Sequence, residues 1–329
     1  DTDHAARLFE LSELGNIYTR IMNPTNDVLE KRLADMEGGV AALAVASGQA
    51  ASLYSIQNIA RAGDNFVCSS HIYGGTFNLF KNTFKDMGIE ARFVDPRDPE
   101  NFRKATDDNT RAYYAETYPN PSFEVFPIGE VASIGLEYGV PLIMDNTAAP
   151  VICKPFDHGA AITMYSTTKY LGGHGNSIGG IIIDSGKFDW EAHQKRFPSL
   201  REPDSGYHGA VWIEAAKPLG PIAYILKARV TLLRDAGAAM SPFNAFLFLQ
   251  GVETVALRME RHCENAMAVA AYLNSHPKVE KVIHPSAQEG EIKRRADTYL
   301  GGNYGGLMGV ELKGGKEAGQ AFINKLKMF

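Results

Sequence analysis

The chain has 329 residues, of which 45% are hydrophobic, 22% charged and 10% aromatic. This composition excludes a disordered tail, a collagen and a coiled coil, and at roughly 150 residues per domain the length indicates about two domains. Lys and Arg total 33 against 38 for Asp and Glu, a net charge of -5. We therefore expect no nucleic-acid partner and no binding to an anionic membrane.

The spacing of cysteines and histidines excludes other kinds of site. Cys68, Cys153 and Cys263 form no CxxC pair, and no two histidines lie three to five residues apart. We expect neither a disulfide framework nor a metal site from such spacing. No apolar run approaches the ~18 residues of a membrane span. These features favour a protein of the reducing cytoplasm.

Short β-prone runs alternate with segments of helical period between residues 43 and 184. Most of the runs are apolar on both faces, which is typical of βαβ units and a mostly parallel sheet covered by helices. We therefore predict an α/β fold, in which ligands bind beyond the carboxyl ends of the strands. The predicted strands are Asn65–Cys68, Arg92–Val94, Arg111–Glu116, Pro141–Met144, Ala161–Tyr165 and Gly180–Ile183.

Two turns after apolar runs have the residues of a ligand site. Ser47, Gly48 and Gln49 follow the apolar run 40–46 and open a predicted helix. Serine is a good N-cap, and the free N–H groups of the first turn bind anions, although a plain cap is an equally good interpretation. Tyr73 precedes two glycines after another strand, where its ring could stack on a flat cofactor.

The most informative run is 164–173, in which an apolar strand ends in three hydroxyl residues and then Lys169. A lysine is usually a solvated charge, but one that follows a buried strand can be desolvated, which frees its amine to form a Schiff base. Asp145 ends the preceding predicted strand. It could pair with a protonated pyridine nitrogen, such as that of pyridoxal phosphate; the alternative is a cap or turn acid.

A second region begins with an apolar rhythm of three and four residues from Leu249 to Leu273, which predicts one long helix. Cys263 lies on its apolar stripe, so we interpret it as a core thiol. Strands at 279–283 and 307–312 and a helix over 315–329 follow. Because the chain begins at Asp1 and ends within that helical pattern, we expect a fragment whose C-terminal domain is incomplete.

Six motifs together resemble, in order, those of the Cys/Met-metabolism family of fold type I pyridoxal-phosphate (PLP) enzymes. The resemblance runs from about residue 9 to residue 329. Three further stretches, 16–25, 203–209 and 233–259, resemble the O-acetylhomoserine sulfhydrylases (O-acetylhomoserine aminocarboxypropyltransferases) within that family. The six motifs are Tyr18-x-Arg20, Ser47-Gly48, Tyr73-Gly74-Gly75, Asn120-Pro121, Asp145-Asn146-Thr147 and Ser166-x-Thr168-Lys169-Tyr170.

The resemblance implies a role for each of these positions. Lys169 would form the Schiff base with the cofactor and shuttle protons, Asp145 would pair with the pyridine nitrogen, and Tyr73 would stack on the ring and assist departure of the leaving group. Tyr18 and Arg20 would reach the cofactor phosphate of the neighbouring subunit. The other implied cofactor-binding residues are Ser47, Gly48, Gln49, Asn120, Thr147, Ser166 and Thr168.

It also implies the organisation of the protein: an arm over residues 1–38, a PLP-binding large domain over 39–248 and a C-terminal domain over 249–329. The arm would contact a neighbouring subunit in a homotetramer, a dimer of dimers. The arginine that binds the substrate carboxylate in the family is expected after residue 329.

The implied reaction is a γ-replacement, in which O-acetylhomoserine and a sulfide or thiol give homocysteine, or methionine, and acetate. Free sulfide, a small thiol or a sulfur-carrying protein would all fit as sulfur donor. A cystathionine γ-synthase and a methionine or cystathionine γ-lyase share this chemistry and remain alternatives. A catalytically silent relative that binds PLP or a partner protein is the alternative of another class, whereas a nicotinamide-dependent oxidoreductase lacks its glycine fingerprint.

Overall fold

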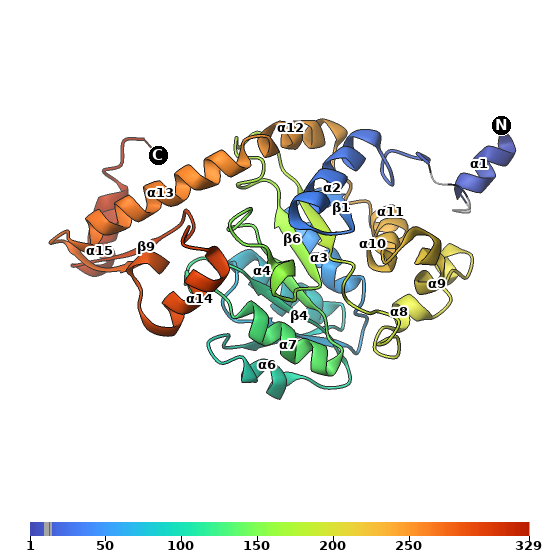
Figure 1. The fold of residues 1–329 in the computed structure, drawn as a ribbon, viewed down its shortest axis with the longest axis horizontal. Helices are drawn as coiled ribbons and strands as arrows, with labels where there is room; N and C mark the ends of the chain where they lie inside the picture. Colours follow the sequence, from blue (N-terminus) through green and yellow to red (C-terminus); the bar gives the residue numbers. More distant parts are fainter. Residues whose placement is uncertain (10–12, 14, 329) are drawn as a thin grey trace.

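The computed structural model describes residues 1–9, 13 and 15–328. A sheet surrounded by helices forms its centre (Figure 1). The sheet has seven strands, in the order β1-β7-β6-β5-β4-β2-β3. All six predicted strands are present within one or two residues of their expected ends, and the apolar run before Ser47 adds a seventh. The strands are β1 (Ala41–Val45), β2 (Asn65–Ser69), β3 (Glu90–Val94), β4 (Thr110–Glu116), β5 (Leu142–Asp145), β6 (Ile162–Ser166) and β7 (Gly180–Asp184).

The sheet is mostly parallel, as predicted, but its edge is not. Strands β3, β2, β4, β5 and β6 pair in parallel, whereas β7 is antiparallel to both β6 and β1. A parallel strand needs a long crossover, usually a helix. The segment between β6 and β7 contains no helix, and the chain returns directly along its neighbour. The carboxyl ends of β1, β4, β5 and β6 consequently lie at the same edge.

Helices cover both faces of the sheet and bury alternate residues of each strand. On one face, Tyr113 and Met144 pack under α2 (Pro24–Glu37), α6 (Glu100–Ala105), α7 (Ile128–Tyr138) and α12 (Pro242–Val252). On the other face, Tyr114 and Ile143 pack under α3 (Gly48–Gln57), α5 (Phe84–Asp86), α9 (Trp212–Ala216) and α10 (Ala223–Ala228). Burial on both faces explains why the sequences of these strands are continuous apolar runs. The short helices of the same region are α4 (Gly74–Asn78), α8 (Pro198–Arg201) and α11 (Arg234–Ala236), with π-helical turns at Leu79–Thr83 and Arg229–Leu233.

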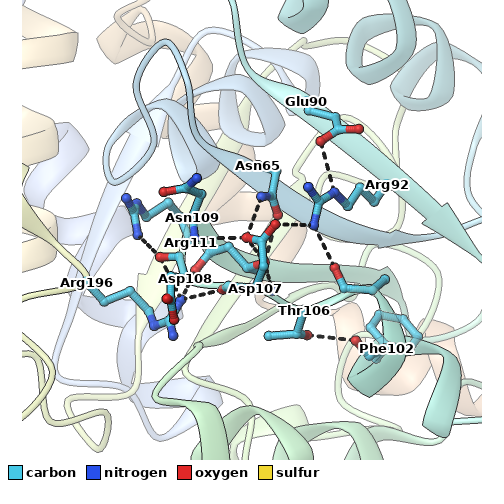
Figure 2. A network of polar contacts seen from close by, with 12 residues as sticks. Asn65, Glu90, Arg92, Phe102, Thr106, Asp107, Asp108, Asn109, Arg111 and Arg196 are labelled. Carbon is cyan, nitrogen blue, oxygen red and sulfur yellow. Dashed lines mark hydrogen bonds and ion pairs between the residues drawn. The ribbon is translucent and has the colours of Figure 1, made fainter.

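Polar contacts hold the amino-terminal edge of the sheet together (Figure 2). The Asp107 carboxylate accepts hydrogen bonds from Asn65 Nδ2 at 2.9 Å and Arg92 Nη1 at 2.7 Å. Partial burial raises the pKa of Asp107, but these two donors outweigh it and bring the pKa to about 2. Arg196 Nη1 donates to the Asp107 carbonyl at 2.9 Å. Hydrogen bonds made by side chains thus link the strands at this edge, whereas the opposite edge carries the candidate site residues.

The long helix predicted from residue 249 to residue 273 is wrong in one respect, because the structure breaks it. Helix α12 ends at Val252, and α13 (Val255–Asn274) begins after Glu253 and Thr254. The Gly251 carbonyl accepts from Thr254 N at 3.2 Å and from the Arg258 guanidinium at 2.8 Å. These contacts lie at the last turn of α12, where the regular helix stops.

The C-terminal part of the chain forms a smaller α/β unit beside α13 (Figure 1). Strands β8 (Val279–Ile283) and β9 (Gly309–Leu312) pair antiparallel, and Cys263 is buried in the core as predicted. The final predicted helix is shorter than expected, since α15 covers Gly315–Ile323 and Phe329 lies outside the described residues. Helices α1 (Thr2–Phe9) and α14 (Gly290–Leu300) complete the chain. In the described part, no helix combines the length and apolarity needed to cross a membrane.

A buried acid in the sheet gives a testable pH dependence. Burial raises the pKa of Asp184 to about 7, against a hydrogen bond from Gly186 N that lowers it. From about pH 4 to 7 the unfolded chain ionises this group while the folded chain does not, so stability falls with rising pH. We expect Asp184→Asn to unfold at the same denaturant concentration as the parent near pH 4 and to gain roughly 2 to 4 kcal/mol by pH 8. An equal difference at both pH values would contradict this expectation.

Candidate active site

The candidate site lies at the carboxyl edge of the sheet, as the sequence predicts. Asp145 is the last residue of β5, Ser166 is the last residue of β6, and Ser47 follows β1. A cavity of about 730 Å³ opens between these strand ends. Of the twelve residues predicted to bind cofactor, ten line this cavity: Ser47, Gly48, Gln49, Tyr73, Asn120, Asp145, Thr147, Ser166, Thr168 and Lys169.

The first turn of α3 forms one end of the cavity. Ser47 caps the helix, as predicted, because its side chain accepts a hydrogen bond from Ala50 N at 3.1 Å. The N–H groups of Gly48 and Gln49 have no carbonyl acceptor within the helix and therefore point out of the helix end. A Cβ atom on Gly48 would lie 2.5 Å from Ser166 Cβ. Only glycine thus lets the helix end approach the end of β6 and form one compact anion site.

Two threonines that the sequence assigned to cofactor binding have partners within the protein. The Thr168 hydroxyl donates to the Gly179 carbonyl at 3.2 Å and accepts from Gly179 N at 3.1 Å. Thr147 Oγ1 accepts from Ser166 N at 2.8 Å, and Thr147 N donates to Asp145 Oδ1 at 2.9 Å. Thr147 therefore orients Asp145 and the end of β6, while Thr168 lines the cavity with its hydroxyl already paired.

Two carboxyl groups lie side by side on the cavity floor. Asp145 on β5 is in register with Glu116 on β4, and both line the cavity. Burial raises the pKa of Asp145 to about 6, against the hydrogen bonds from Thr147 that lower it. Burial and the neighbouring Asp145 charge raise the pKa of Glu116 well above its ordinary value. A cationic group placed against Asp145 would offset this cost of burial.

Lys169 lies at the cavity wall on the segment that follows β6. The sequence suggested that this lysine is desolvated, but in the chain by itself the residue is exposed. The reason is local. After Ser166 the chain leaves the sheet and forms a turn, in which Lys169 N donates to the Ser166 carbonyl. The amine is therefore free to meet a ligand in the cavity.

Tyr73 covers the cavity from the beginning of α4. The residue is 56% exposed, and its backbone N–H donates to Glu116 Oε1 at 2.6 Å. A Cβ atom on Gly75 would lie 2.5 Å from the Tyr73 ring and 2.7 Å from Gln49 Nε2, so the ring packs across this glycine. Tyr73 thus presents an aromatic face to the cavity from a fixed backbone.

Tyr18 and Arg20 do not line the cavity of their own chain. The Arg20 guanidinium lies over the Tyr18 ring, 5.2 Å from its centroid, and Tyr18 is 60% exposed. These two residues are therefore the part of the predicted cofactor set that this fold does not bring together. The Tyr18 ring is exposed, and Arg20 beside it is partly buried.

Several residues that line the cavity were not predicted from the sequence. Glu116 ends a strand as Asp145 does, and the same reading of strand ends could have found it. Arg258 lies near the start of α13, and its guanidinium donates to the backbone carbonyls of Tyr170 at 2.6 Å and Gly251 at 2.8 Å; it fastens the Lys169 segment to α13. No sequence pattern showed that contact. The other missed residues include Ser52, Thr76, Tyr118, Tyr170 and His262.

Known proteins resemble this chain over its full length. The family model described as Cys/Met metabolism PLP-dependent enzyme matches residues 1–329. An O-acetyl-L-homoserine sulfhydrylase of Leptospira meyeri is 53% identical over all of this chain and 76% of its own length. A homocysteine synthase of Schizosaccharomyces pombe is 46% identical, with the same two coverages.

Two solved structures share the fold. A Campylobacter jejuni protein described as an O-acetylhomoserine (thiol)-lyase, which carries N'-pyridoxyl-lysine-5'-monophosphate, superposes with a TM-score of 0.96 at 38% identity, covering all of this chain and 81% of its own. The O-acetylhomoserine sulfhydrylase of Wolinella succinogenes gives a TM-score of 0.82 at 35% identity, covering 94% and 86%. The α/β fold of type I PLP-dependent transferases is thereby confirmed. The chain belongs to the Cys/Met-metabolism family of PLP-dependent enzymes.

Proposed function

We propose that this protein converts O-acetylhomoserine and sulfide to homocysteine and acetate. The observation that carries the proposal is the single cavity that unites Lys169, Asp145, Tyr73 and an anion site at the start of α3. Relatives and solved structures named for the same sulfhydrylase reaction support this substrate. A methionine product would require methanethiol in place of sulfide.

The cavity fits pyridoxal phosphate at three points. The helix end at Gly48 and Gln49, with the half-buried Ser166 beside it, suits a phosphate. Asp145 has the raised pKa of a buried acid without a cation and suits a protonated pyridine nitrogen. Lys169 offers an exposed amine that can bind the aldehyde carbon covalently. Asn120 lies at the cavity rim and would contact the ring hydroxyl.

Bound PLP withdraws electrons from the substrate, and the protein selects the bond that breaks. In our proposal Lys169 Nζ accepts the proton from the substrate Cα and later returns it. Asp145 keeps the pyridine nitrogen protonated and fixes the ring plane. Tyr73 packs on the ring and its hydroxyl assists departure of acetate from Cγ.

We further propose that Tyr18 and Arg20 complete the phosphate site of a neighbouring subunit. Their place outside the cavity of their own chain, with Tyr18 exposed, supports this assignment, since an arginine is the preferred partner of a phosphate. Large exposed apolar side chains support a contact between copies of the chain. Such residues on α2, α12 and α13 are Val28, Phe243, Phe246 and Leu257. A homotetramer, as a dimer of dimers, is the proposed assembly.

The domain limits are proposed as 1–38 for the arm, 39–248 for the PLP-binding domain and 249–329 for the C-terminal domain. A separate small core of Ala270, Val279 and Val282 supports the last of these. We place the protein in the cytoplasm, where its three buried free cysteines would stay reduced. Free sulfide is the proposed donor, with delivery by a sulfur-carrying protein as the alternative.

Product analysis tests the reaction. The purified protein with PLP would be given O-acetylhomoserine and sulfide, O-succinylhomoserine and cysteine, or methionine alone. Homocysteine in the first reaction at the highest kcat/KM supports the proposal, whereas cystathionine in the second would indicate a γ-synthase. Turnover of methionine alone, with none of the acetyl ester, would indicate a γ-lyase. A protein that binds PLP but turns over none of the substrates would be a silent relative.

The close approach of Gly48 to Ser166 gives a prediction about phosphate binding. In Gly48→Ala the new methyl group would press against Ser166 Cβ and Cα and push the helix end away from β6. Losing one or two charge-assisted hydrogen bonds should weaken PLP binding roughly 10- to 100-fold. The matched control is Gly319→Ala, where a Cβ would meet no described atom within 4 Å. Equal PLP affinity of both variants, measured by titration, would count against the site.

A further inference from the structure

Glu116 is a buried carboxyl group whose contacts join two parts of the cavity. Only 8% of the residue is exposed, and it ends β4 at the cavity floor. Its Oε1 accepts a hydrogen bond from Tyr73 N at 2.6 Å, and the carboxyl also accepts from the backbone N–H of Asn120. The segments that carry Tyr73 and Asn120 therefore share one acceptor group.

The surroundings of the Glu116 carboxyl group favour its protonated, uncharged form. The titratable groups that act on it are Asp145 on β5, Cys68 on β2 and Tyr114 on β4 itself. Two acids so close in a buried site do not both ionise readily. Burial raises the pKa of Asp145 too, against the hydrogen bonds from Thr147 that lower it.

We propose that Glu116 is a positioning residue of this active site, which holds the Tyr73 and Asn120 segments over the cofactor through their backbone N–H groups. The inference deepens the proposed function and rests on it for the reaction, but not for binding of the cofactor. Tyr73 is the N-cap residue of the short helix α4, and its own side chain makes no capping hydrogen bond. The hydrogen bond to Glu116 holds the Tyr73 backbone N–H, just before the helix, at the cavity floor.

The position of that ring matters because stacking and assistance to the leaving group both depend on it. A displacement of about 1 Å in a catalytic group can cost roughly 100-fold in rate. Residue 116 must supply an acceptor oxygen, on a side chain as long as that of glutamate. Glu116→Gln keeps such an oxygen, whereas Glu116→Ala removes it.

The experiment compares Glu116→Ala and Glu116→Gln with the parent as holoenzymes. For Glu116→Ala we expect kcat to fall roughly 10- to 100-fold with little change in KM. We also expect a weaker visible circular dichroism band of the bound PLP, since the ring that stacks on it is displaced. Glu116→Gln should stay within about threefold of the parent in kcat and retain the band.

A matched control separates positioning from stability. Asp184 is likewise a buried strand-end acid that accepts a backbone N–H, from Gly186 at 2.8 Å, but it lies outside the cavity. Asp184→Ala should change the melting temperature without changing kcat per bound PLP or the dichroism band. Three results would overturn the proposal: an unchanged kcat and band in Glu116→Ala, a Glu116→Gln variant as impaired as Glu116→Ala, or the same loss in Asp184→Ala. If the parent binds PLP but acts on another substrate, the proposed reaction fails while the dichroism comparison still tests Glu116.

Discussion

In Lys169→Ala, we expect turnover of O-acetylhomoserine with sulfide to fall by at least about 1000-fold. A positioned acid–base group contributes roughly 100- to 10,000-fold by itself, and Lys169 also supplies the covalent attachment of the cofactor in our account. Lys169 is exposed and forms no side-chain hydrogen bond with another described residue, so the variant should fold. A steady-state assay of homocysteine formation measures the effect.

Two controls distinguish this loss from a general effect of removing a lysine. Lys195→Ala removes another exposed lysine, outside the cavity, and should keep the parent's kcat/KM. Added small primary amines should restore part of the activity of Lys169→Ala, because they can replace the missing base. Activity of Lys169→Ala within tenfold of the parent would show that Lys169 is not the essential base of the reaction.

Asp145→Asn should produce two opposite effects. Homocysteine formation should fall roughly 100- to 1000-fold, because an amide cannot form the ion pair with a protonated pyridine nitrogen and a broken buried pair costs several kcal/mol. The protein without cofactor should become more stable at pH 8, by about 1 to 3 kcal/mol, since burial raises the pKa of Asp145 to about 6 and asparagine never ionises.

Denaturant unfolding with and without PLP, together with the activity assay, tests both effects. Near pH 4 the stability advantage of Asp145→Asn should shrink to less than about 1 kcal/mol, because the aspartate is then protonated in the folded chain and about half protonated in the unfolded chain. Loss of activity accompanied by loss of stability without cofactor would indicate that Asp145 is a structural acid. That result would favour the alternative interpretation of Asp145 as a turn or cap residue.

The sequence predicted the strands well because they are buried on both faces. The run 142–144 is continuously apolar and is followed by Asp145, which lines the cavity. The antiparallel direction of β7 was not predicted, since strand direction depends on the connection and not on the composition of the strand. The break after Val252 was also not predicted, because the apolar rhythm continues across it; the Arg258 guanidinium bonds the Gly251 carbonyl there.

Within the site, a residue could be predicted where its role depends on its own place at a strand end or helix start. Asp145, Ser47 and Gly48 are of this kind. The exposure of Lys169 was not predictable, because it depends on the path of the turn after β6. Glu116 also ends a strand and could have been found by the same rule, but its hydrogen bond to Tyr73, 43 residues away in the chain, was not predictable from the sequence.

The most direct test of the account is to identify the lysine that carries the cofactor. The holoenzyme would be reduced with borohydride, digested and analysed by mass spectrometry for a phosphopyridoxyl group. We predict that the group lies on Lys169 and that reduction of Lys169→Ala leaves none at any lysine. A phosphopyridoxyl group on a different lysine, or a parent protein that binds PLP without forming a reducible bond, would contradict it.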